Sequence, residues 1–222
     1  MHAKSDHPDM TRRRLFTSLA LLPMVGLGAT TASAQVGRRY RIELVIFEHT
    51  TAESRRLQEE IASVREPNLT GSEMGGRIYQ DSRRGFELQR AASRVEDSGA
   101  GRVLARLAWD QLGRDHASSP WLKVQQGRRL GARQAVFGDQ ATAAQPIVAD
   151  EDRYELEGRL RVWVGRFLHL ETDLVYHVDR AGNGAEPLGI AVRGHQRMNS
   201  GSQLFYLDHP VVGIIARATR LN

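Results

Sequence analysis

The chain has 222 residues, a net charge of +5 and no cysteine. The lack of cysteine excludes thiol catalysis, Cys-ligated zinc, disulfide bonds and the lipidated cysteine of a lipoprotein. Lys123 is the only lysine after residue 34, so arginine supplies most of the positive charge. Guanidinium groups bind carboxylates and phosphates in bidentate fashion, which favours acidic partners; GC-rich codon usage is the alternative explanation.

Residues 1–34 have the three-part layout of a cleaved export signal. Arg12-Arg13-Arg14 precedes an apolar stretch that continues to about Ala29, and Ala32-Ser33-Ala34 supplies small residues for cleavage. An arginine pair in this position is typical of the twin-arginine type of signal. The apolar stretch is shorter than the ~20 residues that a spanning helix needs, so a permanent membrane anchor is not expected.

The mature protein is therefore expected to be residues 35–222, a single domain in the bacterial periplasm with no transmembrane segment. Met1 and Met10 both fit as the start of the leader. Nucleic acid is not an expected partner in this compartment, and the sequence has no basic–aromatic motif of an RNA or DNA binder.

The first half of the mature chain predicts two strands and two helices. Residues 40–47 alternate as a strand, with one face formed by Tyr40, Ile42, Leu44 and Ile46. Thr50-Thr51-Ala52-Glu53 predicts a capping box that opens a helix, which stops before Pro67 and buries Leu57, Ile61 and Val64. After a loop over 66–76, we expect a helix over 87–97 with its inward face formed by Leu88, Ala91, Ala92 and Val95. A strand over 103–109 follows.

The pattern is poor over 113–150, apart from a short run at 121–124, and predicts a long loop or exposed excursion. Beyond it, residues 154–164 and 168–176 alternate between apolar and charged or polar side chains, and a turn at 180–184 leads to strands near 188–198 and 212–218. Such alternation is typical of antiparallel strands with one wet face. The expected fold is a single α+β domain, mainly an antiparallel β-sheet with about two helices packed on one face.

Two groups of residues could carry chemistry, and neither fits well. His169, Asp173 and His177 would line up on a helix, but their surroundings predict a strand, along which four residues span ~13 Å, too far to share one metal ion. Asp208-His209 could be half of a hydrolytic dyad, with Ser200 or Ser202 close in sequence. The sequence has no Gly-x-Ser-x-Gly elbow, however, and an Asp-His-Pro segment more often stabilises a turn.

Three motifs in the last third carry a family resemblance: Arg166-Phe167-Leu168-His169-Leu170 with Asp173-Leu174, then His195-Gln196-Arg197-Met198-Asn199-Ser200, and then the segment from Leu204 to Gly213 that contains Tyr206-Leu207-Asp208-His209-Pro210. Together they resemble the CsiV family of peptidoglycan-binding proteins. Earlier stretches agree in outline, at Val45-Ile46-Phe47 and at Ala108-Trp109-Asp110-Gln111. The chain departs from the family pattern at Arg106, Gln196, Asn199 and Phe205.

The resemblance implies an exported, non-enzymatic accessory protein that binds peptidoglycan and supports wall assembly or cell shape, without cofactor or metal. A membrane-bound wall synthase or its regulator is a candidate second partner. Arginines at 159, 161, 166 and 197 could gather with His169 on the wet face and pair with stem-peptide carboxylates. The candidate ligand-binding residues are Arg166, His169, Arg197, Tyr206, Asp208 and His209, the last two in part structural. Two alternatives stay open: a protein–protein adaptor that uses a sheet edge, and a periplasmic hydrolase that uses Asp208-His209.

Overall fold

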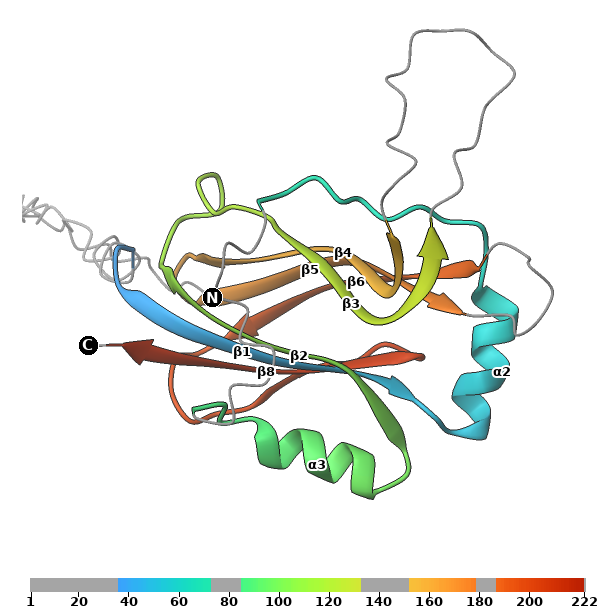
Figure 1. The fold of residues 1–222 in the computed structure, drawn as a ribbon. Helices are drawn as coiled ribbons and strands as arrows, with labels where there is room; N and C mark the ends of the chain where they lie inside the picture. Colours follow the sequence, from blue (N-terminus) through green and yellow to red (C-terminus); the bar gives the residue numbers. More distant parts are fainter. Residues whose placement is uncertain (1–35, 73–84, 133–151, 179–186, 222) are drawn as a thin grey trace, which may run out of the picture.

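The computed structural model describes residues 36–72, 85–132, 152–178 and 187–221 (Figure 1). The predicted leader over 1–34 and the predicted turn over 180–184 lie outside the described residues. Neither α2 nor α3, the helices of the described part, has the length and apolarity needed to cross a bilayer.

Within the described ranges, eight strands form two four-stranded antiparallel sheets that pack face to face (Figure 1). Sheet 1 has the order β2-β1-β8-β7, with β1 at Arg39–His49, β2 at Gly101–Leu112, β7 at Phe205–Leu207 and β8 at Val212–Leu221. Sheet 2 has the order β3-β4-β5-β6, with β3 at Leu122–Ala132, β4 at Asp152–Val164, β5 at Leu168–Val178 and β6 at Leu188–Met198. The helices are α2 at Ala52–Ile61 and α3 at Gln89–Asp97. The predicted α+β class with mainly antiparallel strands is confirmed, although the strands form two sheets.

The core lies between the sheets and follows the predicted alternation. Tyr40, Ile42, Leu44 and Ile46 of β1 are each 1% exposed or less. Across from them, sheet 2 contributes the inward residues Leu156, Leu160, Val162, Leu168, Leu170 and Leu174. Each aliphatic side chain buried in this way stabilises the fold by about 1.5–3 kcal/mol relative to an exposed one. The same alternation fixes which side chains must point outward.

Of the two helices in the described residues, α3 alone covers a sheet face. Leu88 and Ala92, before and within α3, pack against Val45 and Phe47 on the outer face of sheet 1, as the inward face predicted for this helix requires. Helix α2 lies at one end of the sandwich instead (Figure 1).

The predicted inward face of α2 is wrong at Ile61 and Val64, whereas Leu57 is half-buried. The helix ends at Ile61, which is 40% exposed, and Val64 beyond it is 74% exposed. Ser54 and Gln58 are buried instead, and the Gln58 amide donates a hydrogen bond to Glu48 of β1 at 3.5 Å. The contact with the end of β1 therefore decides which face turns inward.

The helix also starts one residue later than the predicted capping box. Thr51, not Thr50, is the N-cap, and its hydroxyl oxygen accepts a hydrogen bond from the Ser54 amide at 3.2 Å. The Thr50 hydroxyl donates to the carbonyl of Gly99 at 2.8 Å and so ties this corner to the end of α3.

The predicted loop over 113–150 contains a full strand, since residues 122–132 form β3 at the edge of sheet 2. Register shifts between Gln126 and Arg129 and between Arg129 and Gly131 disrupt its pairing with β4, which explains why the sequence lacks regular alternation there. Residues 133–150 lie outside the described residues.

A crossing segment, Ser63–Ser72, runs over the outer face of sheet 2 (Figure 1). It pairs with Gly189 of β6 at one end and with Leu122 of β3 at the other. Beneath it, the fully buried side chains of His177 and Glu157 are hydrogen-bonded at 3.1 Å. The crossing segment thus covers one end of the outer face of sheet 2, which the sequence predicts to be exposed to solvent.

Candidate functional site

Among the described residues, the other end of the outer face of sheet 2 is exposed along β6, at Arg193, His195 and Arg197, whereas Thr70 and the β2–β3 loop contact it along β4. Cross-strand pairing aligns three rows of outward side chains there: Trp163–His169–Arg197, Arg161–Glu171–His195 and Arg159–Asp173–Arg193. They alternate with core residues on β4, β5 and β6, so they share one face. Arg159, Arg161, His169 and Arg197 therefore lie on a common face, as hypothesised, while Arg166 lies beside them in the β4–β5 turn.

Aromatic rings pack tightly in this region. His169 stacks on the indole of Trp163, with ring centroids 3.8 Å apart and planes within 9°. Nδ1 of His169 and Nε2 of His195 are hydrogen-bonded at 2.9 Å. Since their centroids are 5.0 Å apart and their planes within 10°, the two imidazoles lie side by side in nearly one plane. His116, from the β2–β3 loop, packs edge-on against Trp163 at 5.0 Å.

Guanidinium groups surround these rings. Arg197 lies over the ring of Phe167 at 4.6 Å, and Arg166 contacts the same ring at 5.6 Å. Arg161 forms an ion pair with Glu171 at 2.8 Å. Within the described part of the chain, Arg197 forms no ion pair. We call the set His116, Arg161, Trp163, Phe167, His169, His195 and Arg197 the aromatic–basic patch.

A neighbouring ring extends this arrangement. The guanidinium groups of Arg159 and Arg161 lie over Trp121 at 4.4 Å and 4.5 Å. Arg159 also pairs with Asp173 at 3.3 Å, and Arg193 pairs with the same carboxylate at 2.8 Å. Arg159 and Arg193 are therefore held in place beside the patch. Both pair with the Asp173 carboxylate, and Arg159 also packs on the Trp121 ring.

The electrostatics of the patch are set by its crowded positive charge. Burial lowers the pKa of His169, and the positive charges of His195, Arg197 and His116 lower it further. The hydrogen bond between His169 and His195 also needs at least one neutral imidazole, because one of the two nitrogens must accept.

The remaining candidate residues lie elsewhere. Tyr206 stacks on Phe47 at 6.3 Å, on the outer face of sheet 1 that also carries α3. Its hydroxyl donates to Asp208 at 3.0 Å, and burial together with this carboxylate raises the pKa of Tyr206 to about 12. The six candidates therefore fall into two groups on opposite outer faces: Arg166, His169 and Arg197 on sheet 2, and Tyr206 and Asp208 on sheet 1, with His209 just beyond.

Asp208 and His209 have separate partners. Asp208 accepts from Tyr206 and lies 3.8 Å from His49, whereas Nδ1 of His209 accepts a hydrogen bond from the Val211 amide at 3.3 Å. Burial lowers the pKa of His209. Among the described residues, no serine or threonine hydroxyl contacts His209 and no group of His, Asp or Glu side chains could hold a metal ion. His209 also interacts with the backbone of Ala191 in β6, so its contacts attach the segment before β8 to the neighbouring strand.

Sequence reasoning missed several members of the patch. His116 lies in a region with no regular pattern, Trp163 belongs to no motif, and His195 opens a family motif but was not singled out as a candidate. Alternation could have placed Trp163 and His195 on the charged face, but only the strand register puts them beside His169.

These observations define a strand-rich domain with aromatic and basic side chains gathered on one outer sheet face. The sequence matches the family described as "Peptidoglycan-binding protein, CsiV" over residues 14–221, nearly its whole length, and the chain belongs to this family. The resemblance found in the last third is thereby confirmed. No curated protein and no solved structure matches the chain.

Proposed function

We propose that this chain is an exported, non-enzymatic envelope protein that binds peptidoglycan through the aromatic–basic patch. The observation that carries the proposal is the row of Trp163, His169 and Arg197 on one outer sheet face, in a member of a peptidoglycan-binding family. Aromatic rings next to cations suit a ligand that is both a sugar and a carboxylic acid.

The charges of the patch match the acidic groups of the wall. Stem peptides carry free carboxylates, and a guanidinium group binds a carboxylate through two parallel hydrogen bonds. Arg197 is exposed and is held over Phe167, so little side-chain freedom is lost when it binds an anion. The turn residue Arg166 lies on the same ring and extends the positive surface.

The rings offer a second kind of contact. Sugar rings have apolar faces, and an indole or imidazole presents a flat apolar surface with a polar edge. Trp163, His169 and His195 lie parallel to one another within 10°. Such an arrangement favours a glycan strand that runs along the sheet beside the arginines.

The predicted leader and the family together support a role in the cell envelope. A twin-arginine-type signal would place the protein in the periplasm, where peptidoglycan is accessible and nucleic acid is absent. There it would act as an accessory to wall assembly or cell shape. Replacing Arg12 and Arg13 by lysine tests the export route: loss of export supports the twin-arginine type, and unchanged export contradicts it.

A second candidate function is that of an adaptor for a membrane-bound wall synthase or its regulator. Leu204 and Tyr206 are exposed at and before the short edge strand β7, on the face opposite the patch. Exposed apolar side chains beside a sheet edge favour a protein partner. A pure adaptor has no affinity for purified sacculi.

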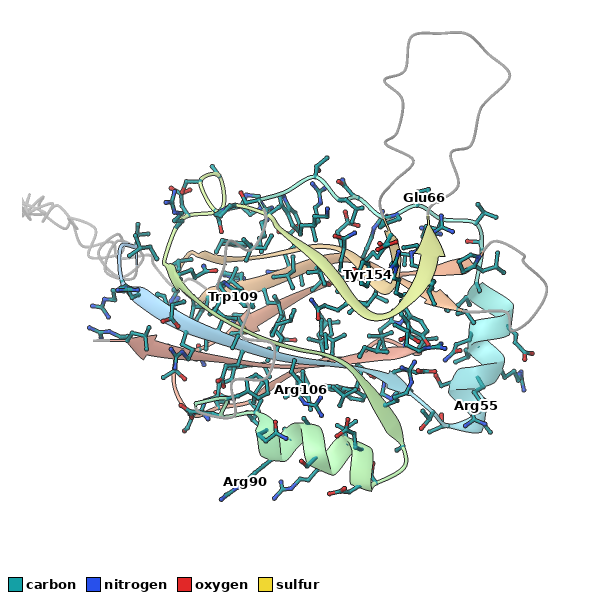
Figure 2. All side chains as sticks on the ribbon, viewed as in Figure 1. Arg55, Glu66, Arg90, Arg106, Trp109 and Tyr154 are labelled. Atoms are coloured by element: carbon teal, nitrogen blue, oxygen red, sulfur yellow. The ribbon has the colours of Figure 1, made fainter. Side chains whose placement is uncertain are left out.

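Co-sedimentation of the purified protein with sacculi across a salt series tests the proposal. We expect pelleting that weakens with added salt, since exposed charge pairs are screened. Arg197→Ala should weaken pelleting, whereas Arg90→Ala should not. Arg90 is the matched control because it is also exposed and points away from the sandwich on α3 (Figure 2). No pelleting at low salt, or equal loss in both variants, would contradict the proposal.

A further inference from the structure

The His169–His195 pair has a property that sugar binding does not require. The two imidazoles are joined by a 2.9 Å hydrogen bond between Nδ1 of His169 and Nε2 of His195. One of these two nitrogens must donate and the other must accept, so the pair holds no more than one extra proton without losing the bond. A second proton would place two positive charges within contact distance of each other.

Charged groups face this pair from every neighbouring element. They are Arg161 on β4, Glu171 on β5, Arg193 and Arg197 on β6, His116 in the β2–β3 loop and Arg166 in the β4–β5 turn. Glu171 is paired with Arg161, and the carboxylate nearest to Arg193 is that of Asp173. The net field at the pair is therefore positive, which agrees with the lowered pKa of His169.

We propose that the His169–His195 pair and Arg197 together form a proton-linked carboxylate site, in which an anionic group of the ligand binds as the pair takes up one proton from solvent. The inference rests on the proposed function and names the group of the wall that the patch recognises. In the bound state a protonated His195 donates its Nε2–H to Nδ1 of His169. The second N–H of His195 and the guanidinium of Arg197 then both place positive charge next to the ligand carboxylate.

Linkage determines the direction of the pH effect. A bound carboxylate removes the excess positive field and favours the charged imidazole, so the ligand and the proton each strengthen the binding of the other. Stem carboxylates stay ionised above about pH 5. Affinity therefore rises as the pH falls from 7.5 to 5.5. A shift of one pKa unit on binding corresponds to about a tenfold tighter complex.

Calorimetry with muropeptides released from sacculi by a muramidase tests the inference. Titrations at pH 6.5 in two buffers of different ionisation enthalpy give the number of protons taken up. For a shift of one pKa unit centred near pH 6.5 we expect net uptake of about half a proton per ligand, and binding that is severalfold, at most about tenfold, tighter at pH 5.5 than at pH 7.5. Muropeptides with amidated carboxyl groups should bind more weakly and without uptake.

Two variants separate a titrating role from a structural one. His195→Gln keeps a hydrogen-bonding side chain beside His169 and should lose most of the proton uptake while it still binds at pH 7.5. His49→Gln, on the opposite face beside Tyr206, should leave uptake unchanged. Binding of equal strength at both pH values with no uptake would overturn the inference and leave peptidoglycan binding intact. No binding at any pH would overturn both.

Discussion

Substitution of Gly158 is the most stringent test of the register between β4 and β5, which aligns the outward side chains of sheet 2. It lies within β4, next to Arg159, with a φ of +131°, and pairs with Leu174 of β5. A Cβ at this position would lie 2.4 Å from the carbonyl oxygen of Asp173 and 2.8 Å from the Cα of Leu174. Both neighbours are backbone atoms, so Gly158→Ala cannot be accommodated by a side-chain rotation.

Two costs add up in this variant. The backbone conformation is one that L-residues rarely adopt, which costs about 1–3 kcal/mol. Forcing β4 and β5 apart costs about 1–3 kcal/mol more, as for other overpacked positions. The free energy of unfolding should therefore fall by about 2–6 kcal/mol. In a domain of this size each kcal/mol lowers Tm by about 2–4 °C.

Gly131→Ala is the matched control, because Gly131 has a φ of +109° and no atom within 4 Å of an added Cβ. It should show only the conformational cost of about 1–3 kcal/mol. Urea denaturation followed by circular dichroism measures both variants. A Gly158→Ala variant within about 0.5 kcal/mol of Gly131→Ala, the accuracy of such comparisons, would refute the close approach of β4 and β5.

Three further predictions concern the fold around the site. Thr51→Ala removes the N-cap of α2 and should lower the free energy of unfolding by about 1 kcal/mol in urea denaturation, and Thr51→Ser should restore it. His177→Leu removes the imidazole from the buried carboxylate of Glu157 and should cost about 3 kcal/mol; adding Glu157→Gln should recover part of the loss, and no recovery would contradict the pairing of the two side chains. The lowered pKa values of His169 and His209 mean that the unfolded chain binds protons more readily than the folded one, so stability should fall as the pH drops through about 6.5. Denaturation at pH 7.5 and 5.5 checks this, and equal stability at both values would contradict it.

Strands with regular alternation could be predicted because burial of one sheet face requires an apolar side chain at every second position, a pattern that the sequence shows directly. β1 and β5 are examples, where every second residue enters the core. β3 could not be predicted in the same way, because Gly127, Gly131 and two register shifts disrupt its pairing. The face that α2 buries depends on the tertiary contact between Gln58 and Glu48. Helical periodicity alone does not predict such a contact.

The candidate site was predictable only in part for a related reason. The family motifs pointed to His169 and Arg197, which the structure places side by side. The same motifs included Tyr206 and Asp208, which the structure places on the opposite outer face. Between β6 and β7 the chain passes from sheet 2 to sheet 1, and the outer faces of the two sheets point in opposite directions. Motif residues that are close in the sequence therefore need not share a surface.

The most direct test of peptidoglycan binding at the aromatic–basic patch is NMR of the histidine and tryptophan rings during titration with soluble muropeptides. The account predicts that the ring signals of His169, His195 and Trp163 shift in a saturable manner. The signals of His49 and His209, near Tyr206 on the other side of the sandwich, should not move. Shifts confined to His49 and His209, or no shift of any ring, would contradict the central claim.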